Sequence, residues 1–415
     1  MSRARRLPDD CFALPPGVDW TPVEDALERL RTSLHPVTGA ETMPLAEAVG
    51  RILAAPLIAH RSNPPRANAA VDGYAFPFAD APAEARLPLV PGRAAAGHPL
   101  AAPVPPGHAC RILTGAEMPA GADTIVLQED CAVTETHVSF PRPKKPGANV
   151  RPAGEDAMAG IEVLPAGRQL TAADLARATA VGLAEVEVHT RLRLAVLSTG
   201  DELIEPGAEG PGIYDANRPM LRALGQAMGA EIVDLGMARD READIRAAFD
   251  RAAVEADAMI TTGGASSGDE DHVSRLLTTE GQVSTWRIAV KPGRPLALGT
   301  WSGLPVFGLP GNPVAAFVCA LIFVRPALSL LSGSGWADPQ AFSVPAAFGK
   351  SKKPGRREYL RARIRDGRAE VFHSEGSGLV GGLSWAEGLV DLPHEAAEIT
   401  PGDPVRYLPF SSFGL

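Results

Sequence analysis

Glycine-rich loops follow apolar, strand-like runs at three places in the second half of the sequence. Residues 192–197, 258–260 and 306–307 lead into the loops 198–202, 261–268 and 308–313. Glycine lets backbone N–H groups approach an anion, and the N-terminus of a following helix adds the positive end of its dipole. In a parallel sheet such loops lie together beyond the carboxyl ends of the strands. The pattern therefore predicts a site for a phosphorylated or otherwise anionic small molecule.

Acidic residues gather at or near the same predicted strand ends. They are Asp201, Glu202, Asp215, Asp240, Asp269 and Asp271. Carboxylates beside a phosphate-binding loop favour Mg²⁺, a hard cation held by a few carboxylates together with substrate oxygens. The alternative for any single acid is that it caps a helix or is solvated in a loop. The set as a whole favours the divalent-ion interpretation.

Basic residues occur in two further groups. Lys291 directly precedes a Pro-Gly turn at a predicted strand end, where its charge can meet a bound phosphate rather than a surface ion-pair partner. The second group consists of Lys350, Lys352, Lys353, Arg356 and Arg357. Alone, this basic group is typical of a solvated loop. Paired with another site, it can gather an oxyanion, because arginine offers bidentate donors.

Several familiar kinds of chemistry are missing from the sequence. The glycine loops lack the G-K-[ST] ending of a P-loop and the G-x-G-x-x-G dinucleotide pattern. There is no G-x-S-x-G nucleophile elbow, and the 9 histidines have no metal-ligand spacing. The sequence therefore gives no support for covalent catalysis.

Composition limits the cell compartment and the partners. The chain has 415 residues and a net charge of -9, which suits several domains and disfavours non-specific nucleic-acid binding. Its 4 cysteines form no C-x-x-C pair, which indicates isolated thiols in a reducing compartment. The apolar run 314–324 is shorter than the ~20 residues that cross a bilayer, so we expect a buried helix there. With no secretory signal either, the sequence predicts a cytoplasmic protein with no membrane or nucleic-acid partner.

The elements that position these residues can be predicted from spacing. A helix is expected from about 23 to 34, with a capping box at Thr21 and Glu24, and a short helix over 45–53. Residues 59–156, rich in proline and glycine, read as β structure. Thr171 is expected to cap a helix to about 181, followed by a strand over 185–188.

The second half alternates helices and strands before it becomes β-rich. Helices are expected over 219–228 and 242–254 in an α/β section of about 191–335. Strands over 359–364 and 369–372 flank an Asp-Gly hairpin signal, and a last strand covers 405–408.

Taken together, these segments resemble the MoeA family of molybdopterin molybdenumtransferases, which includes the E domain of gephyrin. The resemblance covers residues 20–410 and lies in motifs that occur in the family's order: 71–75, 111–116, 121–130, 150–156, 198–203, 213–218, 262–271, 291–295 and 308–314. The sequence departs from the family pattern at Ala69 and Ala265, where a hydroxyl and a valine are usual. Arg287 and Arg294 stand where lysines are usual, and arginine cannot copy lysine geometry.

The resemblance implies an elongated multidomain subunit of α/β plus β class. It has a helical linker domain (17–58 and 157–190), an inserted β-rich domain (59–156), a parallel-sheet α/β molybdopterin-binding domain (191–335) and a C-terminal β-barrel-like domain (336–415). It also implies a homodimer whose sites are shared between subunits, and contact with other molybdenum-cofactor biosynthesis proteins.

The resemblance further implies a transferase that inserts molybdate into adenylylated molybdopterin and releases AMP, with Mg²⁺ or a similar divalent ion. The implied catalytic residues are Asp72, Thr114, Asp156, Glu202, Asp240, Asp271 and Lys291, of which Asp240 and Asp271 would place the metal ion. The implied substrate-binding residues are Thr199, Gly200, Gly263, Gly264, Ser266, Arg287, Pro292, Gly293, Arg294, Gly311, Asn312, Arg356 and Ser377, the last two near the molybdate.

Other functions share parts of this pattern. A catalytically weak carrier or scaffold paralogue would bind molybdopterin without releasing AMP. An adenylyltransferase or a nucleotide amidase would share only the α/β section, whereas the motifs around Asp72 and in the C-terminal part lie outside it.

Overall fold

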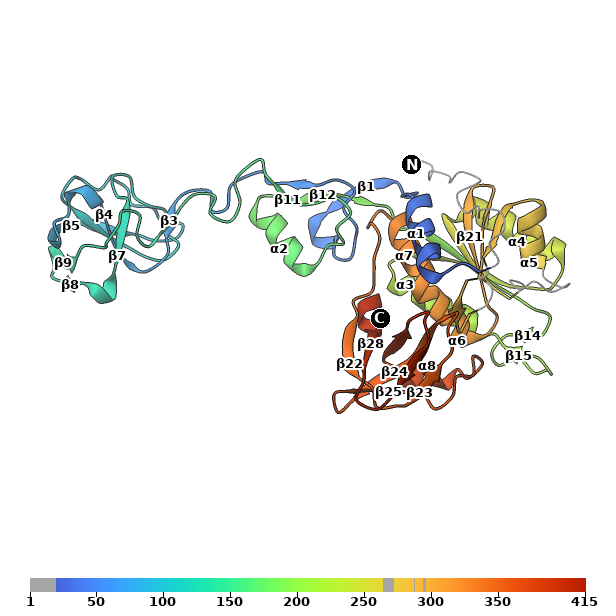
Figure 1. Ribbon diagram of the computed structural model, residues 1–415. Coiled ribbons are helices and arrows are strands. Elements are labelled where there is room, and N and C mark those ends of the chain that lie inside the picture. The colour runs from blue at the N-terminus through green and yellow to red at the C-terminus, as the bar shows by residue number, and fades with distance from the viewer. Residues whose placement is uncertain (1–19, 264–271, 287, 294–295) are drawn as a thin grey trace.

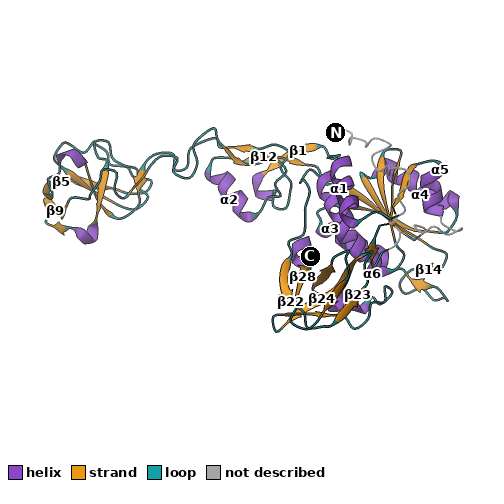
Figure 2. Cartoon of the chain, in the orientation of Figure 1, coloured by secondary structure: helices purple, strands orange, loops and turns teal. Residues whose placement is uncertain are grey.

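The protein is elongated, with a β-rich part at one end and an α/β part beside a second sheet at the other (Figure 1). The computed structural model describes residues 20–263, 272–286, 288–293 and 296–415. Helices concentrate around the α/β sheet, whereas the far end consists mainly of strands (Figure 2). A mixed α/β protein with several sheets, as expected from the sequence, is confirmed.

The α/β part is built on a six-stranded sheet. In spatial order its strands are β16 (Glu231–Ala238), β13 (Arg193–Thr199), β17 (Ala258–Thr262), β21 (Leu304–Leu309), β20 (Leu296–Trp301) and β18 (Gln282–Trp286). The first four strands are parallel, but β20 and β18 are antiparallel to their neighbours, so the expectation of a parallel sheet holds only in part. For β20 and β21 the cause is the two-residue turn Ser302-Gly303, both with positive φ, because such a short link joins only antiparallel strands.

Helices cover both faces of this sheet. They are α3 (Asn217–Ala227), α4 (Glu242–Glu255), α5 (His272–Thr279), α6 (Pro313–Cys319) and α7 (Arg325–Leu331), with the π-helical turn Ala320–Val324 between the last two. Successive side chains of β13 point to opposite faces of the sheet, so they pack in two different hydrophobic cores. Leu194 and Val196 pack with the cluster of α3, α6 and α7, whereas Ala195 and Leu197 pack with that of α4 and α5.

One apolar helical stretch, Pro313–Leu331, forms the centre of the first core. It has 19 residues, its most apolar 18-residue window has a mean hydropathy of 2.3, and within the described residues it alone is long and apolar enough to cross a membrane. However, 83% of that window is buried inside the structure, as expected of a core helix. The helix extends beyond the predicted end at Arg325-Pro326, because Pro326 lies in the first turn after the π-helical turn, where its missing N–H is tolerated.

A narrow linking segment joins the two ends. It contains the antiparallel pairs β1 (Ala40–Pro44) with β12 (Glu185–His189) and β2 (Leu57–Ile58) with β11 (Glu162–Leu164), together with α2 (Ala172–Ala180). The predicted cap of α2 is confirmed, because Thr171 and Asp174 form a capping box. The predicted helix over 45–53 is wrong. Only Leu45–Glu47 form a 3-10 turn, because Ile52 and Leu53 pair instead with Gln169 and Val188.

Helix α1 (Val23–Ser33) packs against α7 and so joins the α/β core rather than the linking segment. The bounds of α1 agree with the helix predicted from about 23 to 34, but the predicted capping box at Thr21 is wrong. The N-cap is Pro22, and no side-chain cap forms, because the backbone of Thr21 pairs with Ile288 and accepts a hydrogen bond from Ala289.

The β-rich end is a six-stranded sheet in the order β7 (Thr124–Leu127), β4 (Gly73–Phe76), β6 (Ala109–Ile112), β5 (Glu84–Ala94), β9 (His137–Pro141) and β8 (Ala132–Val133). The pair β3 (Asn68–Ala69) with β10 (Val150–Arg151) and the 3-10 turns Phe78–Asp80 and Gln128–Asp130 complete it. Phe76 and Phe140 stack at 4.7 Å between ring centroids in its core.

The C-terminal sheet has the order β19 (Val290–Lys291), β24 (Arg357–Arg365), β26 (Gly388–Leu392), β28 (Pro404–Pro409) and β22 (Phe342–Pro345), with β25 (Arg368–Val371) beside β24. The pair β23 (Lys350–Lys352) with β27 (Ala397–Ile399), helix α8 (Gly381–Trp385) and a 3-10 turn, Phe410–Phe413, lie around it. The Asp-Gly hairpin is confirmed, since Asp366 and Gly367 have φ of 49° and 73° between β24 and β25. Strand β19 comes from the α/β part of the chain, so the two regions share a strand.

Candidate functional site

The carboxyl ends of β13 and β17 meet at the glycine loops. The Thr199 hydroxyl donates to the carbonyl oxygen of Thr262 at 3.2 Å. Gly263 has a φ of 88°, and a Cβ atom there would lie 2.3 Å from the carbonyl oxygen of Thr199. Only glycine fits this close approach of two backbones, and it leaves the loop amides accessible. The predicted residues Thr199, Gly200 and Gly263 are therefore brought together.

The loop after β21 joins this group through a residue that the sequence did not indicate as functional. Asn217, at the start of α3, donates from Nδ2 to the carbonyl oxygen of Gly311 at 2.7 Å. Its other side-chain atom, Oδ1, is buried and has no hydrogen-bond partner among the described residues. A buried acceptor without a partner costs about 1–3 kcal/mol, so a ligand donor at this point would be stabilising. The signal that could have suggested Asn217 is its place in the motif 213–218.

Acidic side chains lie at the neighbouring strand ends of β13 and β16. The backbone N–H of Asp240 donates to Oδ1 of Asp201 at 3.2 Å, and the N–H of Asp201 donates to Oδ2 of Asp240 at 3.4 Å. Burial, with the charges of Glu202 and Asp201, raises the pKa of Asp240. A cavity of about 440 Å³ opens here, lined by Gly200, Asp201, Leu203, Met237, Ala238, Arg239 and Arg241.

Two of the six predicted acidic residues, and several predicted substrate-binding residues, lie outside the part of the chain that the structure describes. Gly264, Ser266 and Asp271, and with them Asp269, lie outside the described residues, as do Arg287 and Arg294. Among the residues that the structure describes, no group of three His, Cys, Asp or Glu side chains is arranged to hold a metal ion.

Lys291, predicted to meet a phosphate, lies in a network of ion pairs. Its ammonium is 3.5 Å from Oε2 of Glu358 and also pairs with Glu375. Lys350 contacts the same two carboxylates, at 3.3 Å for Glu358. The adjoining turn is tightly packed, because a Cβ atom at Gly293 would lie 2.5 Å from Sγ of Cys319 in α6. Lys291 is thus fixed where β19 joins the C-terminal sheet.

A cavity of about 220 Å³ lies beside this network, between the start of α6 and the C-terminal sheet. Its lining includes Lys291, Pro292, Lys350, Arg361 and Glu375. The loop that carries Glu375 reaches the β21–α6 connection, because the N–H of Val314 donates to the carbonyl oxygen of Ser377 at 3.1 Å. The predicted residues Lys291, Pro292, Asn312 and Ser377 therefore lie in one neighbourhood.

The rest of the second basic group is dispersed. Lys352 is buried and donates to three backbone carbonyls, of Lys353, His394 and Glu395. Arg356 is half-buried, does not line the cavity beside Lys291, and lies near enough to Lys352 to help burial lower the pKa of that lysine. Lys350 is the member of this group that reaches Lys291.

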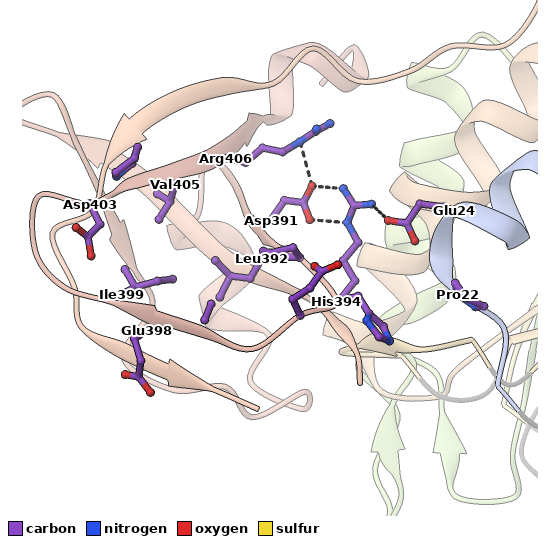
Figure 3. A pocket seen from close by; sticks show the side chains of 15 residues that line it. Pro22, Glu24, Asp391, Leu392, His394, Glu398, Ile399, Asp403, Val405 and Arg406 are labelled. Atoms are coloured by element: carbon purple, nitrogen blue, oxygen red, sulfur yellow. Dashed lines mark hydrogen bonds and ion pairs between the residues drawn. The ribbon is translucent and has the colours of Figure 1, made fainter. Parts of the chain in front are cut away.

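A larger cavity, of about 780 Å³, lies between α1 and the C-terminal sheet and, of the candidate site residues named from the sequence, is lined only by Arg357 of the second basic group. Figure 3 shows that arginines lining this cavity are already paired with carboxylates. Arg357 pairs with Asp391 at 2.6 Å and with Glu24, and Arg406 pairs with Asp391 at 3.1 Å. These pairs clamp α1 onto the sheet, so we assign this cavity a structural role despite its size.

The predicted residues of the first third lie far from all of these. Oδ1 of Asp72 accepts hydrogen bonds from the N–H and the hydroxyl of Thr114, at 2.7 and 2.6 Å, which lower the pKa of Asp72. Asp156 accepts one from Nδ2 of Asn63 at 2.9 Å. Asp72 and Thr114 flank β4 and β6, at the opposite end of the molecule from β21 (Figure 1). One chain therefore does not bring Asp72 and Thr114 to the glycine loops.

The fold and these groups define a class of multidomain α/β protein whose glycine loops gather at the carboxyl edge of the α/β sheet. Comparison with known proteins identifies the family. The chain matches the MoeA N-terminal region (domains I and II) over residues 21–182, a probable molybdopterin binding domain over 195–330 and the MoeA C-terminal region (domain IV) over 343–410. The chain belongs to the MoeA family, and it is a transferase enzyme.

Similar proteins agree along the whole chain. A molybdopterin molybdenumtransferase of Haemophilus influenzae is 35% identical over 94% of this chain and 98% of its own. Molybdopterin molybdenumtransferase 2 of Mycobacterium tuberculosis is 36% identical over 88% of this chain and 94% of its own. A crystal structure of the molybdopterin biosynthesis MoeA protein from Pyrococcus horikoshii superposes with a TM-score of 0.82, at 28% identity, over 94% of this chain and all of that one.

Proposed function

We propose that this protein inserts molybdate into adenylylated molybdopterin and releases AMP, as a molybdopterin molybdenumtransferase of molybdenum cofactor biosynthesis. The observation that carries the proposal is the juxtaposition of glycine loops, a carboxylate pair and a lysine-lined cavity around the carboxyl edge of one sheet. Loops that present backbone N–H groups suit a phosphorylated pterin, and the cations suit an oxyanion. The names of relatives more than 30% identical support this function.

The roles follow from the chemistry of each group. The loops with Thr199, Gly200, Gly263, Gly311 and Asn312 bind the pyrophosphate and the pterin, together with Gly264 and Ser266. Pro292 and Gly293 follow Lys291 directly, and with Arg287 and Arg294 of the same sequence segment they bind the substrate. Lys291 stabilises the negative charge that develops as AMP departs. Arg356 and Ser377 contact the molybdate. Glu202 acts at the first loop. No protein side chain is needed as a nucleophile.

The acidic edge fits a divalent ion by its donor chemistry. Asp201 and Asp240 are hydrogen-bonded to each other's backbone, and the raised pKa of Asp240 reflects burial and two neighbouring negative charges that a cation would relieve. Mg²⁺ usually takes only one or two carboxylates and completes its shell with water and substrate oxygens. We propose that Asp240, with Asp271, holds Mg²⁺, which when bound offsets the charge of the substrate phosphates.

A homodimer would complete the site. Half-buried Asp72 and exposed Thr114 are hydrogen-bonded to each other, yet within one chain they lie at the opposite end from the loops. A two-fold partner can bring its own Asp72, Thr114 and Asp156 to these loops. Heterodimers of one Asp72→Asn chain and one Lys291→Met chain should then regain activity, since one of their two sites is intact. Heterodimers as inactive as both parent homodimers would contradict the shared site.

We also propose the domain division 17–58 with 157–190, 59–156, 191–335 and 336–415. Separate hydrophobic clusters of the linking segment, the β-rich end and the C-terminal sheet support it, whereas α1 packs in a cluster that the α/β part shares with the C-terminal region. A cytoplasmic location, contact with other molybdenum-cofactor biosynthesis proteins, and no binding to nucleic acid or membrane complete the proposal. The net charge of -9 supports the exclusion of nucleic acid.

AMP release from adenylylated molybdopterin, measured with Mg²⁺ and with or without molybdate, tests the proposed function. We expect release that depends on molybdate. Tight binding of the pterin with no release in either condition would identify a carrier or scaffold instead.

A further inference from the structure

Two lysines and two glutamates form a closed group beside the 220 Å³ cavity. Lys291 stands opposite Glu358 in the register of β19 and β24, and Lys350 begins β23. Each ammonium contacts both Glu358 and Glu375. The two positive charges are therefore neutralised by two carboxylates.

The two carboxylates differ in how firmly they are held. Glu358 lies on the central strand β24, and its side chain is only 9% exposed, so it cannot leave the lysines without a change in the sheet. Glu375 lies on the loop between β25 and α8, and its side chain is 48% exposed. Rotation about its own side-chain bonds would carry the Glu375 carboxylate into solvent.

The backbone around Glu375 is fixed while its side chain is not. Arg361 donates to the carbonyl oxygens of Ser374, Gly376 and Leu379, at 2.6, 3.1 and 2.7 Å. These bonds hold the loop on both sides of Glu375 against β24. A departure of the Glu375 side chain would therefore leave the cavity wall, with its lysines and Arg361, in place.

The cavity has the size and the charge for a small dianion. Its 220 Å³ hold several water molecules at ~30 Å³ each, and hence a tetrahedral oxyanion. A monoanion that replaces the Glu375 carboxylate adds no charge to the contact with Lys291 and Lys350. A dianion adds one further negative charge, and Arg361 on the cavity wall offers a third cation to balance it.

We propose that Glu375 is a displaceable counter-ion, which occupies the lysine pair Lys291–Lys350 until a tetrahedral dianion takes its place. The inference rests on the proposed function only in taking this cavity as part of the substrate site. The lowered pKa of Glu375, about 2 because of its hydrogen bonds to Lys291 and Lys350, agrees with a carboxylate that stays charged. The dianion is molybdate or the phosphate group of the nucleotide. It must therefore compete with the Glu375 carboxylate for Lys291 and Lys350.

Direct binding of the anion tests the proposal without any turnover. Molybdate, and separately AMP, is titrated calorimetrically into the pterin-free full-length protein at constant ionic strength. We expect Glu375→Gln to bind one of these anions about tenfold more tightly than the wild-type protein, because the anion no longer displaces a charged partner. Tighter molybdate binding identifies molybdate as the occupant, and tighter AMP binding identifies the phosphate group.

The matched control is Glu370→Gln, which removes the same charge from the same sheet. Glu370 pairs with Arg363 at 3.0 Å, has a side chain that is 39% exposed, and does not line the cavity. Equal effects of the two variants would show a general effect of charge and overturn the proposal, as would unchanged affinity for both anions in Glu375→Gln. Glu375→Asp, which keeps the charge, should bind as weakly as the wild-type protein.

The outcome of the binding test does not depend on whether the proposed function is correct. If Glu375→Gln binds anions more tightly but the wild-type protein releases no AMP, the proposal that Glu375 is a displaceable counter-ion is supported. The proposed transferase activity is then rejected. If AMP release depends on molybdate while Glu375→Gln binds both anions as the wild-type protein does, the activity remains and the counter-ion is rejected.

Discussion

The C-terminal sheet borders two cavities, and each contains a carboxylate between two cations. In the larger cavity Asp391 lies between Arg357 and Arg406, and its side chain is only 2% exposed. In the smaller cavity Glu375 lies between Lys291 and Lys350, and its side chain is 48% exposed. A buried carboxylate holds its cations permanently, whereas an exposed one holds them until another anion competes. Burial of the counter-ion, rather than cavity size, therefore distinguishes a structural ion pair from a binding site.

Removing the buried carboxylate should have the largest effect. Asp391→Asn leaves Arg357 facing a partner that has lost its charge, and the loss of one member of a buried pair costs about 3–5 kcal/mol. Urea unfolding should show this decrease in the free energy of unfolding, while the folded protein keeps its molybdate-dependent AMP release. A decrease below about 1 kcal/mol would mean that Asp391 is no more structural than a surface partner.

Removing a cation from the smaller cavity should affect activity rather than stability. Lys291→Met is expected to lower AMP release about 100-fold, as for the loss of a group that stabilises charge in the transition state. Its free energy of unfolding should change by less than about 1 kcal/mol, because its partner Glu375 is half-exposed and its buried partner Glu358 keeps the contact with Lys350. Lys353→Met, at an exposed lysine of the same basic group, is the control and should retain full activity.

The contribution of Glu375 to stability should depend on pH in a defined window. The pKa of Glu375 falls from 4.5 to about 2 on folding, so the unfolded chain takes up this proton first as the pH decreases. The stabilisation is therefore complete above about pH 4.5 and is lost as the pH falls towards 2. The difference in unfolding free energy between the wild-type protein and Glu375→Gln should decline over this window from at most about 1 kcal/mol. A difference that stays constant with pH would contradict the coupling to the lysines.

The smallest effect is expected at the outer partner in the larger cavity. Glu24 pairs with Arg357 from α1, but its side chain is 57% exposed, and Arg357 keeps Asp391 when Glu24 is changed. Glu24→Gln should lower the free energy of unfolding by about 0.5 kcal/mol, measured by urea titration. A loss above about 2 kcal/mol would show that the clamp depends on α1 and not on the buried carboxylate.

Local signals in the sequence predicted much of the fold, and the errors occurred where distant segments pair. Thr171 and Asp174 are three residues apart, and their capping box formed as expected. Thr21 and Glu24 show the same spacing, but Thr21 pairs with Ile288, a contact that no local pattern reveals. The apolar periodicity of 45–53 failed for the same reason, because Leu53 pairs with Val188 in the linking segment.

The candidate site divides in the same way. Glycines and strand ends indicated the loops with Thr199 and Gly263, because loop chemistry is local. The contact of Lys291 with Glu375, 84 residues away, depends on how β19 joins the C-terminal sheet and could not be read from spacing. Asn217 was missed because its role is a single hydrogen bond to Gly311, 94 residues further along the chain.

Strand β19 has a mechanical consequence. Its two residues are the edge of the C-terminal sheet and, through the following turn, part of the α/β region, so Lys291 is held by the backbone of both. The edge of that sheet cannot open without withdrawing the ammonium group from its cavity. Amide hydrogen exchange at Lys291 therefore reports the integrity of the anion site, and local opening of this edge would inactivate the site while both cores stay folded.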